Sequence, residues 1–215
     1  MNLQYLGDAL DHWKGSLFEG LIHASLLTDF HVDAMASDAN QWDLKDWRLF
    51  ARLLRVQPSQ IIPHDAYIKL DRQAYFSEIS REGDLFLDPD TGMATGRVRI
   101  LSQYLMPSEL LDLVDSNESR IVAVYQHIRA EKTRARLEKV IRSIRTHRSD
   151  FDCASYESGT VAMLFFSRCP SRIESIVEYY HQTLDRHAIG RIGHWSAQIA
   201  IKESQHTTVP LYERG

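Results

Sequence analysis

Apolar positions along the chain recur in blocks whose spacing predicts alternating helices and strands. Helical spacing appears in residues 8–25, 44–54, 71–79, 107–114, 131–147 and 173–184. Shorter apolar runs that favour strands occupy residues 26–35, 60–64, 84–87 and 121–125. The last of these runs is apolar throughout, which is typical of a strand buried on both faces of a parallel sheet.

Two more strands are predicted near the C-terminus, in residues 151–156 and 160–166. They flank Glu157-Ser158-Gly159, and a short polar linker with glycine predicts a hairpin. The alternation of strands and helices predicts a single α/β domain over residues 1–215, with a doubly wound, mostly parallel sheet. Residues 196–215 alternate only weakly, so we expect an edge strand or an irregular tail there.

Composition narrows the class of protein. Apolar residues make up 44% and charged residues 25%, as in ordinary globular proteins. The net charge of −4 excludes a global basic field, so any nucleic-acid binding needs a local patch. Cys153 and Cys169 form neither a disulfide framework nor a zinc motif. With no signal-peptide pattern in residues 1–6 and no membrane-spanning apolar run, we expect a cytoplasmic protein without membrane contact.

Polar residues stand where the predicted strands end. Because ligands bind at the carboxyl ends of strands in such sheets, we expect these residues to meet at one edge. Proline stiffens the loop after the third strand, and Gly92 allows a ligand to approach the backbone closely. The residues concerned are Asp29 and Asp33 at the first strand, Asp65 at the second, Asp88-Pro89-Asp90-Thr91-Gly92 after the third, and Gln126 and His127 at the fourth.

The first predicted helix begins with a second polar group. Gly7-Asp8 is typical of a helix start, with Asp8 as the N-cap. Asp11 and Lys14 are three residues apart and therefore neighbours on the helix. They form either a surface ion pair or a site in which Lys14 acts as a point charge toward a phosphate or carboxylate.

The helix in residues 132–148 is strongly basic. Such a stripe can neutralise several phosphates of a nucleic acid, or it can simply be a solvated helix face. Arg134 and Arg142 are candidate substrate contacts on it. The basic residues are Lys132, Arg134, Arg136, Lys139, Arg142, Arg145 and Arg148.

Three motifs carry a resemblance to a known family. They are Gly7-Asp8-x-x-Asp11-x-x-Lys14, Phe86-Leu87-Asp88-Pro89-Asp90-x-Gly92 and Val124-Tyr125-Gln126-His127. Together they resemble a family of uncharacterised bacterial proteins. That family is similar to the Rossmann-like methyltransferases that modify adenine N6 in ribosomal RNA, which have a Gly-Asn-x-x-Asp-x-x-Lys-His start and an Asp-Pro-Pro-Tyr catalytic loop. The similarity covers most of the chain in element order, including the C-terminal antiparallel hairpin.

The resemblance implies a Rossmann-like sheet, S-adenosylmethionine as cofactor and a nucleic-acid amine as substrate. Asp88 and the Pro89 carbonyl would accept hydrogen bonds from the target amine, with Asp90 and Lys14 beside them. The cofactor contacts would be Asp65 at the adenine, and Asp29 and Asp33 near the ribose or methionine. The substrate contacts would be Asp8 and Asp11 at the entrance, His127, Arg134 and Arg142.

Two alternative functions stay open. Asp90 and Thr91 replace the second proline and the tyrosine of the catalytic loop, which adds a carboxylate. Asp88, Asp90 and His127, with Asp29 or Asp33, could then hold Mg²⁺ or Mn²⁺ in a nuclease or phosphohydrolase. Lys14 would stabilise the phosphoryl transition state in that case. The third hypothesis is a catalytically silent nucleotide- or protein-binding module.

Overall fold

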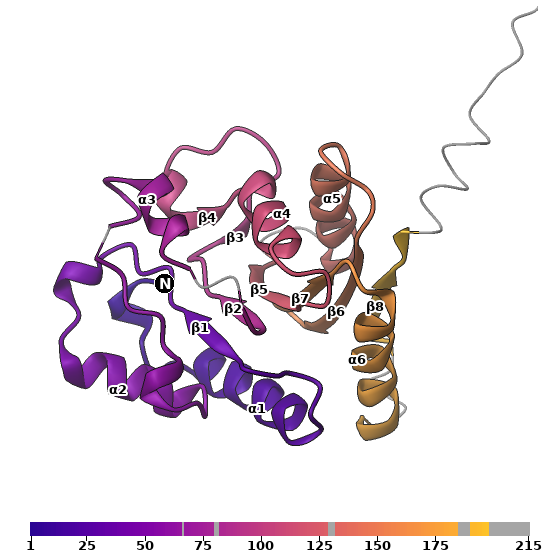
Figure 1. The fold of residues 1–215 in the computed structure, drawn as a ribbon, viewed down its shortest axis with the longest axis horizontal. Coiled ribbons are helices and arrows are strands. Elements are labelled where there is room, and N and C mark those ends of the chain that lie inside the picture. The colour runs from indigo at the N-terminus through magenta and orange to yellow at the C-terminus, as the bar shows by residue number, and fades with distance from the viewer. Residues whose placement is uncertain (66, 80–81, 129–131, 185–189, 198–215) are drawn as a thin grey trace, which may run out of the picture.

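A central mixed sheet with helices on both faces forms the fold (Figure 1). The computed structural model describes residues 1–65, 67–79, 82–128, 132–184 and 190–197. The helices are α1 (Ala9–His23), α2 (Leu44–Leu53), α3 (Arg72–Ser77), α4 (Pro107–Asp115), α5 (Thr133–Arg145) and α6 (Pro170–Thr183). The strands of the sheet are β1 (His31–Asp33), β2 (Leu85–Leu87), β5 (Val122–His127), β6 (Asp152–Ser158), β7 (Val161–Ser167) and β8 (Ile192–Trp195).

The strand order is β1-β2-β5-β7-β6-β8. β1, β2 and β5 are parallel, β7 runs antiparallel to both β5 and β6, and β8 runs antiparallel to β6. The sheet is thus parallel in its first half and antiparallel in its second. Two short strands, β3 (Gly92–Met93) and β4 (Tyr104–Leu105), form a separate parallel pair that the sequence pattern did not predict.

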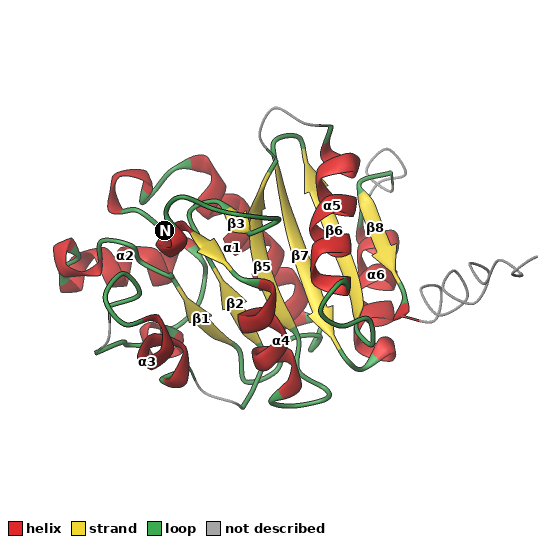
Figure 2. Ribbon diagram, turned by 90° about the horizontal axis from the view of Figure 1, so that it is seen from above, coloured by secondary structure: helices red, strands yellow, loops and turns green. Residues whose placement is uncertain are grey.

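The sheet separates two hydrophobic cores, as the alternation of its side chains requires. Leu85 and Leu87 of β2 face the core covered by α3, α4 and α5, whereas Phe86 faces the core covered by α1, α2 and α6. β5 and β7 alternate in the same way. The view from above, in Figure 2, shows the sheet between these two helical layers. Helices on both faces explain why β2 and most of β5 are apolar throughout.

The first two predicted strands differ from the structure. Asp29 has a φ of 45°, a left-handed conformation that ends an extended run, so β1 begins only at His31. Residues 60–64 contribute one bridge, between Ile61 and Val32, instead of a strand. The next bond of a parallel ladder would need the Ala34 carbonyl, which instead accepts from the Met1 ammonium, and the chain turns away at Met35, whose φ is 43°.

The other elements match their predicted ranges to within a few residues, except β8, which ends at Trp195, before the residues in which an edge strand was expected. The predicted irregular tail overlaps residues 198–215, which lie outside the described part of the chain. Within the described residues, no helix has the length and apolar character needed to cross a membrane.

Candidate functional site

Asp88, Asp90 and His127, which were predicted at strand ends, meet where the chain reverses its direction across the sheet. After β1 the chain passes outward to Ile61, which bridges Val32, and then returns to β2 on the other side of β1. The Asp88 amide donates to the Asp33 carbonyl at 3.0 Å and joins the carboxyl ends of β1 and β2. Ligands of open α/β sheets bind at such a point of reversal.

Lys14 on α1 reaches this edge and holds the Asp88 carboxylate. Its Nζ lies 2.7 Å from Asp88 Oδ2, 3.0 Å from Asp88 Oδ1 and 3.0 Å from Asp11 Oδ1. The three residues are at most 4% exposed. Burial alone lowers the pKa of Lys14, but the two carboxylates outweigh burial and raise it. Burial also raises the pKa of Asp88, against the attraction of Lys14 and the N-terminal ammonium.

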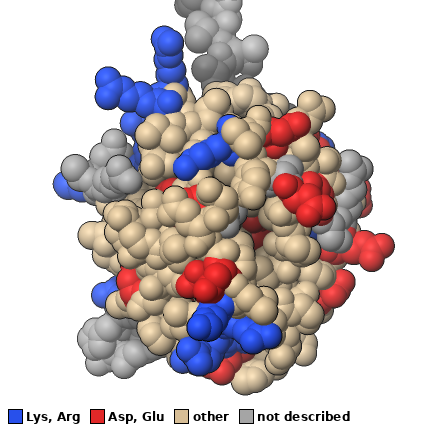
Figure 3. Space-filling model, turned by 90° about the vertical axis from the view of Figure 1, so that its left-hand side faces the viewer, with Lys and Arg blue, Asp and Glu red and all other residues tan. Residues whose placement is uncertain are grey.

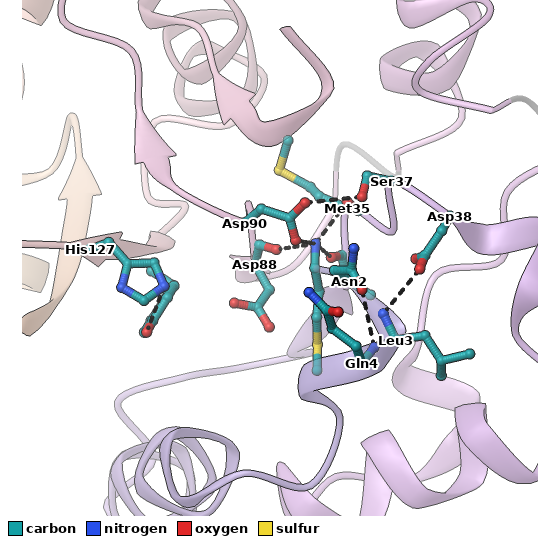
Figure 4. A network of polar contacts seen from close by, with 12 residues as sticks. Asn2, Leu3, Gln4, Met35, Ser37, Asp38, Asp88, Asp90 and His127 are labelled. Atoms are coloured by element: carbon teal, nitrogen blue, oxygen red, sulfur yellow. Dashed lines mark hydrogen bonds and ion pairs between the residues drawn. The ribbon is translucent and has the colours of Figure 1, made fainter. Parts of the chain in front are cut away.

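Oxygen acceptors of both strand ends surround the N-terminal ammonium of Met1. Its nitrogen donates to the carbonyl oxygens of Ala34 at 2.8 Å, Met35 at 2.9 Å and Asp88 at 2.8 Å. Asp90 Oδ1 lies 3.2 Å from the same nitrogen, and Ser37 donates to Asp90 Oδ2 at 2.9 Å (Figure 4). We call Ala34, Met35, Asp88 and Asp90 the ammonium cage. A primary ammonium matches it because it carries three donors and one positive charge.

The backbone at Met35 explains how two successive carbonyls enter the cage. Met35 is completely buried and has a φ of 43°, in the left-handed region. The carboxylate of Asp33 stabilises the turn, since its Oδ1 accepts from the Met35 amide at 2.7 Å. Glycine is the usual residue in such a backbone conformation, and here methionine adopts it instead.

A cleft of about 280 Å³ opens beside the cage. Tyr125 and His127 of β5 form one wall, with Tyr125 Oη 3.4 Å from His127 Nε2, and Lys14 lies 4.4 Å from the Tyr125 ring centroid. The cleft is lined by Met1, Asn2, Tyr5, Asp8, Leu10, Asp11, Lys14, Asp88, Pro89, Asp90, Tyr125 and His127. The structure therefore brings the N-terminal motif, the Asp-Pro-Asp loop and the end of β5 to one place.

Gly92 is required by the close approach of two elements. Its φ is +107°, and a Cβ there would lie 2.6 Å from the Gln126 side chain. Gln126 is fully buried, and its Oε1 accepts from the Met93 amide at 2.8 Å. The glycine thus serves side-chain packing against β5, whereas the sequence suggested close approach of a ligand.

Asp33 belongs to a different buried cluster. Tyr75 donates to its Oδ1 at 2.5 Å, and His64 Nε2 lies 3.3 Å from its Oδ2. His64 also stacks on Tyr75 and contacts Glu78 through Nδ1 at 3.1 Å. Burial alone lowers the pKa of His64, but Asp33 and Glu78 outweigh burial and raise it. Asp33 therefore shapes the loop that follows β1 and does not line the cleft.

Asp29 and Asp65, which were predicted at strand ends, do not join the site, whereas Asp8, the predicted helix cap, does. Asp29 precedes β1 and is exposed at the opposite, amino end of that strand, so its expected place at the carboxyl edge is wrong. Asp65 is exposed, with its amide bound to Glu78. Asp8 caps α1 as predicted, accepting from the amides of Leu10 and Asp11, and also lines the cleft.

Asp88 and Asp90 are each paired with a cation of the chain itself. Lys14 contacts both Asp88 oxygens, while Met1 and Ser37 contact the two Asp90 oxygens. Across the described ranges, no three His, Cys, Asp or Glu side chains are arranged to hold a metal ion. The donor set of Asp88, Asp90 and His127 therefore does not fit Mg²⁺ or Mn²⁺, which are bound by several oxygens directed at the ion.

Much of the predicted basic stripe is engaged within the chain. Arg136 donates to Thr95, Arg145 to the Ser196 carbonyl, and Arg148 pairs with Asp115 and Asp150. Arg134 lies over the Trp195 ring, and Arg142 is exposed. Figure 3 shows another face of the molecule, on the side of α2, where separate groups of Lys and Arg side chains lie among Asp and Glu.

Met1 and Met35 belong to the site although the sequence gives no signal for them, whereas Tyr125 has one. Met35 is an apolar residue in a left-handed turn, and Met1 contributes its ammonium rather than its side chain. Tyr125 belongs to the Val-Tyr-Gln-His motif, whose position at a strand end marked it as part of the edge.

A comparison with models of known protein families found no match, and a comparison with curated proteins found none.

Proposed function

We propose that the chain is a Rossmann-like protein that binds S-adenosylmethionine and transfers its methyl group to a nucleic-acid amine. The observation that carries this proposal is the ammonium cage beside Asp88-Pro89-Asp90, at the point where the chain reverses across the sheet. The antiparallel pair β6–β7, with β7 between β5 and β6, is also typical of methyltransferase sheets.

The cage and its surroundings fit the chemistry of this cofactor. S-adenosylmethionine supplies an electrophilic methyl group and carries a primary ammonium and a sulfonium, both positive. Ala34, Met35, Asp88 and Asp90 would hold the cofactor's ammonium in place of that of Met1. Asp11, Asp88 and Asp90 outnumber the positive groups of Lys14 and Met1, so the edge keeps a negative charge that favours a cationic ligand.

Asp88 and Pro89 are suited to position the target amine. A carboxylate offers about four lone-pair sites, and Lys14 uses one on each Asp88 oxygen, which leaves acceptor capacity toward the cleft. The Pro89 carbonyl adds an acceptor on the same loop. Because the amine of a base is neutral, the chain's contribution is chiefly orientation of the reacting groups, with Lys14 fixing the Asp88 carboxylate.

The proposal is tested by methyl transfer from S-adenosylmethionine labelled in its methyl group to RNA, DNA and free nucleotides. We expect one of these to be labelled, and Asp88→Asn to lower the rate on the order of 100-fold by weakening the orientation of the amine. Circular dichroism and urea unfolding of the variant establish that it is folded. A folded Asp88→Asn protein that retained the full rate would remove Asp88 from the mechanism.

A further inference from the structure

The cleft carries an exposed aromatic side chain at its opening. Tyr5 is 59% exposed and lines the cleft together with Asp88 and Pro89. Across the described ranges, the one other Tyr, Phe or Trp side chain that is exposed is Tyr67, at 44%, and it does not line this cleft. The face of an aromatic ring is apolar, so covering it with a flat ligand is favourable. Tyr5 is therefore placed to contact a ligand of the cleft.

A short helix fixes the direction of the Tyr5 side chain. Leu3–Tyr5 is a 3₁₀ helix, in which the Tyr5 amide donates to the Asn2 carbonyl at 3.1 Å and the Leu6 amide donates to the Leu3 carbonyl at 3.0 Å. Because such a helix has three residues per turn, Asn2 and Tyr5 share one side, and Leu3 and Leu6 share another. Leu3 and Leu6 pack against the hydrophobic core, whereas Asn2 and Tyr5 line the cleft. The core thus anchors this turn and holds Tyr5 at the opening.

The end of β5 forms the wall of the cleft across from this turn. In Figure 4, Asp88 lies between Asn2 and His127, so the turn and the strand end stand on two sides of the Asp88 carboxylate. A flat ring that entered between Tyr5 and His127 would have its faces covered and its edge directed at Asp88 and Pro89. The cleft therefore has the arrangement that a planar ligand with a hydrogen-bond donor on its edge requires.

The charge of the cleft decides which part of a nucleotide can enter it. Asp8, Asp11, Asp88 and Asp90 line the cleft, and Lys14 is the one lysine or arginine among its described lining residues. The excess of negative charge repels phosphates, so the sugar-phosphate backbone stays outside and the neutral base enters. The cleft volume of about 280 Å³ lies at the lower end of ligand pockets. Such a volume has room for one base rather than for several.

We propose that Tyr5 selects an unpaired base, because its ring stacks on the base and places the exocyclic amine of that base at Asp88 and Pro89. This inference rests on the proposed function, since that function supplies the target amine. In a duplex, neighbouring base pairs cover both faces of a base, so the Tyr5 ring cannot stack on it until the base leaves the duplex. The substrate is therefore a single strand, or an unpaired position, of RNA or DNA. Tyr5 binds and positions the base and takes no part in the chemical step.

The experiment uses a short single strand that contains one 2-aminopurine, whose fluorescence falls when the base stacks on an aromatic ring. We expect the full chain to quench this fluorescence. Tyr5→Ala should weaken binding at least about fivefold, the loss expected when one stacked base loses its aromatic partner. The same strand in a blunt duplex should bind more weakly than the single strand.

Two further variants serve as controls. Tyr5→Phe keeps the ring and should keep the affinity for the single strand. Tyr67→Ala removes an exposed tyrosine outside the cleft and should leave that affinity unchanged. Urea unfolding establishes that each variant is folded, and Tyr5→Ala should unfold like the parent chain because the Tyr5 side chain is exposed.

Methyl transfer from labelled S-adenosylmethionine to the same strand separates this inference from the proposed function. A raised KM with an unchanged kcat in Tyr5→Ala, restored in Tyr5→Phe, supports the inference. If Tyr5→Ala binds and reacts like the parent chain, or if the single strand and the duplex bind equally, the inference fails while the proposed function survives. If the strand is not bound at all, the inference fails, and titration with S-adenosylmethionine decides the proposed function by itself. Binding that depends on Tyr5 without any methyl transfer supports stacking at Tyr5 and contradicts the proposed function.

Discussion

The Nζ atom of Lys14 lies 2.7 Å from Oδ2 of Asp88, a contact between two buried residues 74 positions apart in the chain. It fastens the first helix to the loop after β2. Lys14 also contacts Asp11, so a single ammonium neutralises two buried carboxylates. The N-terminal motif and the Asp-Pro-Asp loop are therefore parts of one site, and each depends on the other for its charge balance.

Removal of the Lys14 charge should destabilise the fold. Lys14→Met keeps most of the volume but leaves Asp11 and Asp88 buried without their cation. Breaking a buried pair in this way costs about 3–5 kcal/mol. The free energy of unfolding in urea measures the effect, and Lys45→Met provides the control because Lys45 is exposed on α2. Equal stability of the two variants would mean that the buried contact contributes nothing.

A methyl group at position 92 should be poorly tolerated. The Cβ of Gly92→Ala would lie 2.6 Å from Gln126, and its φ of +107° disfavours any L-residue. Such overpacking typically costs roughly 1–3 kcal/mol. Gly96→Ala is the matched control, since its Cβ would meet no atom within 4 Å. Thermal unfolding should separate the two variants, and an unchanged melting temperature for Gly92→Ala would contradict the assigned contact.

The cluster of His64, Asp33, Tyr75 and Glu78 should make stability depend on pH. The pKa of His64 is raised in the folded chain, so the charged histidine stabilises the fold fully below its unfolded pKa. That contribution is lost as the pH rises through the folded pKa. The loss of unfolding free energy in His64→Gln should hence be larger near about pH 5 than near about pH 9, on either side of the ordinary value of 6.5.

The control for this pH dependence is His12→Gln, because His12 is exposed on α1. Its effect on unfolding free energy should be small at both pH values. If the loss of unfolding free energy in His64→Gln grew toward high pH, the histidine would be neutral in the fold. That result would contradict the raised pKa that Asp33 and Glu78 cause.

Binding of nucleic acid through α5 would involve Arg142 and not Arg148. Arg142 is exposed, whereas Arg148 is paired with Asp115 and Asp150. If α5 contacts phosphates, Arg142→Gln should weaken binding of duplex DNA and reduce its logarithmic salt slope by about 0.9. Arg148→Gln should leave that slope unchanged. Fluorescence anisotropy over a range of salt concentrations measures both, and equal slopes for the two variants would exclude this contact.

The sequence pattern was sufficient for the six helices, for most strands of the central sheet and for one half of the site. Apolar spacing predicted α1 through α6, and the strand-end rule selected Asp88, Asp90 and His127, which line the cleft with Lys14. Periodicity could not locate the first residue of β1, because the left-handed turn at Asp29 depends on local backbone geometry. It also placed Asp65 at a strand end, although residues 60–64 form a single bridge to β1 instead of a strand.

The other half of the site depends on contacts between residues that are far apart in the sequence. The Met35 turn is compensated by a hydrogen bond from its amide to Asp33, and Asp33 is itself held by Tyr75, which is 42 residues away in the sequence. Gly92 is explained only once Gln126 lies against it. The role of Met1 depends on a terminal charge that side-chain patterns do not describe.

Calorimetric titration with S-adenosylmethionine tests most directly whether the edge between β1 and β2 binds this cofactor. The chain should bind it at one site, and Asp90→Ala should weaken binding about tenfold, or 1.4 kcal/mol, by removing the carboxylate of the ammonium cage. The absence of binding, or an affinity that Asp90→Ala leaves unchanged, would contradict the account.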